Sequence, residues 1–280
     1  MTFPSAMVLS AGTIQSVPFY ERLDAAKNAG FDGISIFAAE AASLGEPLET
    51  VRQRIDDAGL SVFETEFIGN WLPGNPGREM PGGLAQVLEM TTPDLVLDVA
   101  AALGSPCVSV GDLYARDCGR DAIVDAFGAL CENAATRDIA VALEFVPVGA
   151  VPDLAAAADI VRAAGQGNGG IMIDAWHFFR SGSDLADLAA MDPALISRVQ
   201  IGDGPALPEP DLDFAMSNAR KFPGEGEMDL PGFVAALRDC GFDGPLSVEI
   251  FAAELASMSG TGIAEKSMRT TRSITSGTAA

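Results

Sequence analysis

Three carboxylates and one amide interrupt the apolar runs that end four successive segments in the second half of the sequence. They are Glu144 in ALEFV, Asp174 in MIDAWH, Gln200 in VQIGD and Glu249 in SVEIF. A carboxylate buried as a bare charge costs several kcal/mol unless it is paired or bound to a metal. Arg198 is the only basic residue close to these segments in the sequence. One such glutamate alone would more often be a structural hydrogen-bond partner, but four polar residues at corresponding places indicate a site.

The chemistry of these side chains favours a divalent cation. Converging carboxylates repel one another, and a cation between them removes that repulsion. Oxygen ligands without cysteine predict one Mg2+ or Mn2+ ion, with Co2+ or Zn2+ as alternatives. The predicted ligands are Glu144, Asp174, Gln200 and Glu249, of which Gln200 offers a neutral amide oxygen. His177 is the only histidine in the chain and lies three residues after Asp174. We expect it to act in catalysis or to orient the substrate.

Short apolar segments alternate with amphipathic ones along the sequence. We predict strands over 6–11, 31–37, 60–67, 106–112, 139–146, 170–177, 197–203 and 245–251, and helices over 17–29, 48–58, 92–103, 121–136, 153–164, 184–191 and 230–240. Continuously apolar strands are typical of a parallel sheet that is buried on both faces. Eight such units favour closure, and no GxGxxG motif follows the first strand. The predicted fold class is therefore α/β, a single (β/α)8 TIM barrel.

A barrel of this kind would bring the polar residues together. The C-terminal ends of its strands form the mouth in which active-site residues lie. The four predicted ligands fall at these ends on strands five to eight. Two long irregular stretches, 70–83 and 204–228, also follow strand ends, and we expect them to shape the substrate site.

Composition limits the partners and the compartment. Acidic residues outnumber basic ones 39 to 17, and the net charge of −22 disfavours binding to nucleic acid or to a membrane surface. No apolar run is long enough to predict a membrane span, and residues 1–15 contain no export signal. The four cysteines are irregularly spaced, so a cytoplasmic location is expected. We expect one domain over residues 1–280, with a loosely packed tail over 273–280.

Several segments resemble the xylose isomerase-like barrel superfamily, the sugar phosphate isomerase/epimerase group. They are GFDGISIF, DAGLSV, DAWH, VQIGD, RKFPGEGEMDL and GFDGPLSVEIF, in that order along the chain. The resemblance implies the same four metal ligands and a catalytic role for His177, the histidine of the DxxH motif. It matches Arg220 to a family arginine that would hold an anionic or oxyanionic part of the substrate. It also implies a homodimer or homotetramer. Gln200 stands where many epimerases have histidine, which is similar to the 3-dehydroshikimate dehydratase-like branch.

The chemistry implied for such a site is proton abstraction next to a metal-bound carbonyl. Our first interpretation is an isomerase or epimerase of a keto-polyol or sugar derivative, a small polyhydroxy carbonyl compound, with Glu144 and Glu249 exchanging the proton. The alternative is a lyase of the 3-dehydroshikimate dehydratase type, with His177 as the base. Gln200 and the apolar segment EFVPVGAVP favour the lyase, because that segment offers few hydrogen bonds to a free sugar. A third alternative is a non-catalytic ligand-binding barrel.

Overall fold

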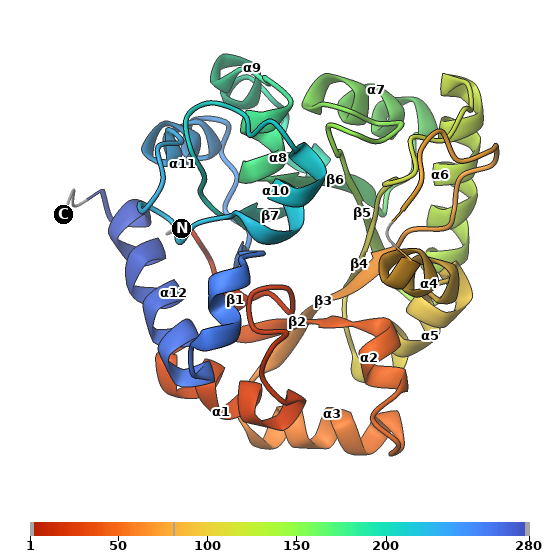
Figure 1. Cartoon of the computed structure of the whole chain (residues 1–280). Helices are drawn as coiled ribbons and strands as arrows, with labels where there is room; N and C mark the ends of the chain where they lie inside the picture. The colour runs from red at the N-terminus through yellow and green to blue at the C-terminus, as the bar shows by residue number, and fades with distance from the viewer. Residues whose placement is uncertain (1–2, 81, 278–280) are drawn as a thin grey trace.

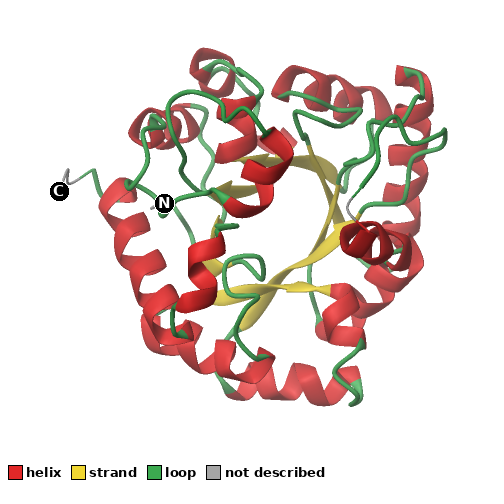
Figure 2. Cartoon of the chain, viewed as in Figure 1, coloured by secondary structure: helices red, strands yellow, loops and turns green. Residues whose placement is uncertain are grey.

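The computed structural model describes residues 3–80 and 82–277, which form a closed barrel of eight parallel strands (Figure 1). Each strand pairs with its neighbours in the chain, and β8 closes onto β1. The strands are β1 (Met7–Leu9), β2 (Gly33–Phe37), β3 (Ser61–Ile68), β4 (Cys107–Val110), β5 (Ala140–Glu144), β6 (Gly169–Asp174), β7 (Ile196–Ile201) and β8 (Leu246–Val248). Figure 2 shows them as an inner ring inside a ring of helices. The predicted (β/α)8 TIM barrel is confirmed.

Helices cover the outer face of the strands. They are α1 (Phe19–Ala29), α2 (Ala38–Ala42), α3 (Leu48–Asp57), α4 (Gly82–Met90), α5 (Pro93–Leu103), α6 (Arg120–Ala135), α7 (Leu154–Ala164), α8 (Ala175–Arg180), α9 (Leu185–Ala189), α10 (Leu212–Asn218), α11 (Leu230–Asp239) and α12 (Gly260–Thr275), with short 3-10 turns η1 (Pro193–Leu195) and η2 (Ala253–Ser257). The predicted irregular stretch 204–228 therefore contains a helix, α10. The predicted strand over 170–177 is too long, because α8 begins directly after β6.

Local signals explain where the main helices begin and end. Asp153 caps α7 by accepting a hydrogen bond from the backbone of Ala156, and Thr92 caps α5 in the same way. Gly30 and Gly104 end α1 and α5 in the left-handed conformation that glycine adopts without strain. These helix ends coincide with the starts of the predicted strands, which is why the sequence located most units correctly.

The side chains of the strands divide into two sets, as alternation along a strand requires. Outward-facing residues such as Val108, Val141 and Ile171 join the large apolar core beneath the helices. Cys107 and Met172 belong instead to a small separate cluster, which lies inside the barrel. The polar residues described below share that inner face. The interior of the barrel thus brings several buried carboxyl groups together.

The last helix completes the ring. Figure 1 shows α12 beside α1, so the two ends of the barrel are joined by helix packing. The helix continues to Thr275, and the side chain of Thr275 is buried. The first residues of the predicted loose tail over 273–280 are therefore helical, and residues 278–280 lie outside the described part. No helix within residues 3–80 and 82–277 combines the length and apolar character needed to cross a membrane.

Candidate active site

The C-terminal ends of β5, β6, β7 and β8 bring the four predicted ligands to one place in the barrel mouth. Glu144 and Asp174 are the last residues of their strands, and Glu249 directly follows β8. Strand pairing sets Asp174 beside Gln200, whose Nε2 donates a 3.1 Å hydrogen bond to Oε1 of Glu249. One ligand atom each from Glu144, Asp174 and His177 lie within 4.8 Å of one another. The residues singled out in the sequence thus surround a common space.

An arginine from outside these strands lies among the carboxylates. The Nη1 atom of Arg220 is 2.7 Å from Oδ2 of Asp174 and 3.1 Å from Oε2 of Glu249. Arg198 does not pair with them, and its Nη2 donates instead to the backbone oxygen of Phe63. The basic residue beside these carboxylates is therefore Arg220, which the resemblance assigned to the site, and not Arg198, which is the closest in sequence. Arg220 is distant in sequence from both of its partners, and only the closed barrel brings the three together.

The loop after β7 holds Arg220 in position. The carboxylate of Asp203 accepts hydrogen bonds of 2.8 to 3.2 Å from the backbone N–H groups of Gly204, Gly224, Gly226 and Met228. Asp203 also pairs with Lys221 through two backbone hydrogen bonds. The guanidinium of Arg220 lies beside the rings of Trp176 and Phe251, 5.1 Å from each ring centroid. Residues 223–226, the PGEG segment, therefore surround the carboxylate of Asp203. Because Asp203 is paired with Lys221, this arrangement also fixes the position of the neighbouring Arg220.

A helix cap places His177 in the mouth. The Oδ1 atom of Asp174 accepts a 3.0 Å hydrogen bond from the backbone N–H of His177, so Asp174 is the N-cap of α8. This cap is the physical reason why the strand ends at Asp174. The Nε2 atom of His177 lies 3.5 Å from Oε1 of Glu144 and 3.4 Å from Nη2 of Arg220. Its Nδ1 atom is buried and has no hydrogen-bond partner within the described residues.

The buried charges of the site shift one another's pKa values. Burial, together with neighbouring carboxylates, raises the pKa of Glu144 and of Glu249. Burial also opposes ionisation of Asp174, but the charge of Arg220 and the hydrogen bonds to Asp174 hold its pKa below the usual value. Burial lowers the pKa of His177 to about 4, so its imidazole is neutral at neutral pH. Asp174 is thus the most firmly ionised carboxylate of the group.

The donor atoms suit a divalent cation. The Oε1 atom of Gln200 is buried and accepts no hydrogen bond from any described residue. A buried amide oxygen normally has a partner, so this one is available as a ligand. The carboxylates of Glu144 and Asp174 provide charged oxygen atoms close by. Oxygen-rich sets of this kind are those that Mg2+ and Mn2+ prefer.

Two buried glutamates of β3 are absent from the predicted site residues. Glu64 is 1% exposed and Glu66 is 4% exposed, and both lie on the inner face of the barrel. The motif FETEF carries the same signal as ALEFV, because both place a glutamate inside an apolar strand. Applied to the first half of the chain, that signal would have identified Glu66 at the end of β3. Ser10 was also missed, and its hydroxyl donates a 3.0 Å hydrogen bond to Oε1 of Glu249.

Glu64 gives a prediction about stability that does not depend on the site. Burial raises its pKa to about 7, against the opposing effects of Arg198 and Ser109. The folded protein therefore favours protonated Glu64, and this contribution to stability is lost as pH rises from about 4.5 through about 7. We expect Glu64→Gln to match the natural protein at pH 5 and to be more stable at pH 8, by roughly 2 to 3 kcal/mol. Urea unfolding at both pH values measures this difference, and a difference that is constant with pH would contradict it.

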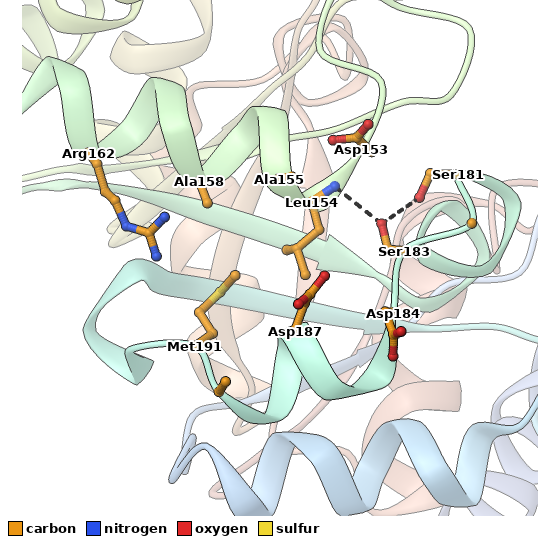
Figure 3. Close-up of a pocket in the computed structure, with 12 residues that line it drawn as sticks. Asp153, Leu154, Ala155, Ala158, Arg162, Ser181, Ser183, Asp184, Asp187 and Met191 are labelled. Atoms are coloured by element: carbon orange, nitrogen blue, oxygen red, sulfur yellow. Dashed lines mark hydrogen bonds between the residues drawn. The ribbon is translucent and has the colours of Figure 1, made fainter.

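A surface groove lies away from these residues. It has a volume of about 450 Å3 and separates α7 from α9 in the outer layer (Figure 3). Asp153 and Asp184, which line it, each accept a hydrogen bond from the backbone of the helix that they cap. Figure 3 also shows Ser181 and Ser183 bonded to each other. Its polar groups thus largely serve the fold, whereas the buried titratable groups converge in the barrel mouth.

Comparison with known proteins places this geometry in context. The family model described as "Xylose isomerase-like TIM barrel" matches residues 23–274. A 3-dehydroshikimate dehydratase of Pseudomonas aeruginosa is 31% identical over 82% of this chain, and the aligned part is 36% of that protein. An inosose isomerase of Bacillus licheniformis is 30% identical over 64% of this chain and 63% of its own length.

Solved structures agree on the architecture. A xylose isomerase-like TIM barrel/4-hydroxyphenylpyruvate dioxygenase fusion protein superposes with a TM-score of 0.84 and 25% identity, covering 97% of this chain and 43% of that one. The chain therefore spans well under half the length of both the dehydratase and the fusion protein.

Proposed function

Because this chain belongs to the xylose isomerase-like TIM barrel family, we propose that it is a divalent-metal-dependent lyase that dehydrates a cyclic polyhydroxy ketone of the 3-dehydroshikimate type. The observation that carries this proposal is that two candidate bases, Glu249 and His177, differ in the hydrogen-bond partners that they already have. Glu249 already receives hydrogen bonds from Ser10, Gln200 and Arg220. The Nδ1 atom of His177 is buried and free of any described partner. With Glu144 and Glu249 proposed as metal ligands, His177 is the base that remains available, and one base suits elimination better than the two-base proton exchange of an epimerase.

The proposed metal site uses the four residues identified in the sequence. Glu144, Asp174 and Glu249 would supply carboxylate oxygens, and Gln200 would supply its unpartnered amide oxygen. A divalent cation held there would polarise the substrate carbonyl and so acidify the neighbouring C–H bond. The donor set favours Mg2+ or Mn2+, with Co2+ or Zn2+ as alternatives.

The protein's own groups account for the remaining chemistry. His177 is neutral at neutral pH because burial lowers its pKa, so it can accept the proton from the carbon next to the carbonyl. The C–O bond on the adjacent carbon then breaks, and the departing hydroxide takes the abstracted proton back from His177 to leave as water, which restores the neutral imidazole. Arg220 favours the ionised forms of Asp174 and Glu249 and holds both carboxyl groups in place. Its Nη2 atom, next to His177, can also face an oxyanion on the substrate.

The comparisons support the lyase without excluding its relatives. The Pseudomonas aeruginosa dehydratase aligns over a larger share of this chain than the Bacillus licheniformis inosose isomerase does. Isomerisation or epimerisation of a keto-polyol is the second candidate, since several curated relatives are inosose isomerases. A small polyhydroxy carbonyl substrate is common to both. A homodimer or homotetramer and a cytoplasmic location remain part of the proposal.

Turnover with and without metal tests the function. We expect the Mn2+-loaded protein to convert 3-dehydroshikimate to an aromatic product, which ultraviolet absorbance detects, and EDTA to abolish that conversion. Incubation with inosose in deuterated water tests the second candidate, because an isomerase would incorporate deuterium next to the carbonyl. If Mn2+ and EDTA left both reactions unchanged at background, the barrel would be a ligand-binding protein and the proposal would be wrong.

A further inference from the structure

Glu66 is a buried carboxyl group that the proposed chemistry does not use. It lies at the C-terminal end of β3, opposite Phe37 of β2 in the strand register. Only 4% of its surface is exposed, and its Oε1 atom has no hydrogen-bond partner in the described part of the chain. No basic side chain within residues 3–80 and 82–277 forms an ion pair with it. A glutamate that served only the fold would normally have both oxygens satisfied.

The surroundings of Glu66 connect it to the site. Burial and the nearby Glu64 raise the pKa of Glu66 to about 8, against the opposing effect of the hydroxyl groups of Ser35 and Ser10. The Ser10 hydroxyl is also 3.0 Å from Oε1 of Glu249, so one hydroxyl group separates the two carboxylates. The charge of Glu66 contributes to the raised pKa of Glu144 as well. Glu66 therefore borders the same space as the proposed metal ligands, from the first half of the barrel.

We propose that Glu66 is a substrate-binding residue whose free oxygen accepts a hydrogen bond from a hydroxyl group of the polyhydroxy ketone. The inference rests on the proposed function for the nature of the substrate. β3 lies across the closed barrel from β7, so Glu66 would hold the part of the substrate that points away from Gln200. The segment after Glu144 is apolar and offers few such contacts. A buried acceptor that loses its partner is costly, and Glu66 would thus select substrates with a hydroxyl at that position.

A matched pair of variants tests this role. Glu66→Gln replaces the carboxyl group with an amide of nearly the same shape, and Glu64→Gln makes the same change two residues deeper on the same face of β3. We measure Mn2+ affinity by calorimetry, then the Kd of shikimate, which keeps the ring hydroxyls but lacks the ketone, and then KM and kcat for 3-dehydroshikimate. Weakening of one hydrogen bond to the substrate supports a change of up to about tenfold. We expect Glu66→Gln to raise Kd and KM by that factor, with Mn2+ affinity little changed, and Glu64→Gln to leave all three near their natural values.

Several results would overturn the role of Glu66. The first is a Glu66→Gln variant whose Kd for shikimate and KM for 3-dehydroshikimate equal those of the natural protein. The second is a Glu64→Gln variant whose shikimate binding is weakened as much as that of Glu66→Gln, which would indicate a general electrostatic effect. Loss of Mn2+ binding in Glu66→Gln would make Glu66 part of the cation site instead. Glu66→Asp, which keeps the carboxyl group but shortens its reach, is also expected to weaken shikimate binding, and this variant serves if Glu66→Gln does not fold. If the natural protein binds shikimate but neither binds Mn2+ nor converts 3-dehydroshikimate, the proposed function is refuted while the role of Glu66 in binding is not.

Discussion

Replacing Glu144 with glutamine is expected to lower kcat/KM for the substrate by at least about 100-fold and to weaken Mn2+ binding by more than tenfold. Glu144 ends β5 and lies within reach of Asp174 and of the ring of His177. Glutamine has nearly the same shape but lacks the negative charge that a divalent cation requires. Its amide would also face the Nε2 atom of His177 in place of a carboxylate. Calorimetric titration with Mn2+ and steady-state kinetics measure the two effects separately.

Glu64→Gln is the control for the Glu144 variant, because it also removes a buried carboxylate from the inner face of the barrel. We expect Mn2+ affinity and kcat/KM to stay near their natural values in that control. Glu249→Gln provides an independent arm, since Glu249 belongs to the same proposed ligand set. Full metal affinity and full activity in both Glu144→Gln and Glu249→Gln would show that the site has been assigned to the wrong residues.

Replacing Arg220 with methionine is expected to destabilise the metal-free protein strongly. Arg220 forms buried ion pairs with Asp174 and Glu249, and removal of one partner from such a pair costs about 3 to 5 kcal/mol. We expect the midpoint of thermal unfolding to fall by roughly 10 °C in EDTA. The loss should be larger at pH 8 than at pH 5, because carboxylates with raised pKa values can take up protons at the lower pH.

Added metal distinguishes an electrostatic role of Arg220 from a packing role. If Arg220 balances the carboxylates, saturating Mn2+ should stabilise Arg220→Met by more degrees than it stabilises the natural protein. Arg198→Met is the matched control, since Arg198 is also partly buried inside the barrel but bonds to backbone oxygens of Ser197 and Phe63. The same gain from Mn2+ in Arg220→Met, Arg198→Met and the natural protein would refute the electrostatic explanation.

The sequence alone predicted the elements whose stability comes from continuous apolar runs and glycine stops. All eight strands were located to within a few residues, because a buried parallel strand has few other ways to appear in a sequence. The short helices α2, α8 and α10 were missed for the opposite reason. α10 has Phe214 exposed, and it depends on an Asp211 cap and on an ion pair between Asp213 and Arg78 of a distant loop. A pattern of local hydrophobicity does not contain such contacts.

The candidate site divides in the same way. Glu144, Asp174, Gln200 and Glu249 were recognisable because each is polar within an apolar strand. The ion pairs of Arg220 were not, since they join residues 46 and 29 positions apart. Glu66 carries the same signal in FETEF, but the predicted site was confined to the last four strands. The position of a polar residue within an apolar strand therefore identifies it as a candidate site residue. Its ion-pair and hydrogen-bond partners become visible only in the closed barrel.

The backbone hydrogen bonds around Asp203 have a consequence for which parts of the sequence can change. Paired backbone bonds between Asp203 and Lys221 close off residues 204–220 at their base, and Arg220 lies at that base. The segment above it is anchored by Arg180 to Glu209 and by Arg78 to Asp213. Insertions or exchanges between these anchors would leave the buried arginine where it is. The sequence of the loop over residues 204–220 can thus change, in evolution or by engineering, and alter which substrate binds while the reacting groups stay fixed.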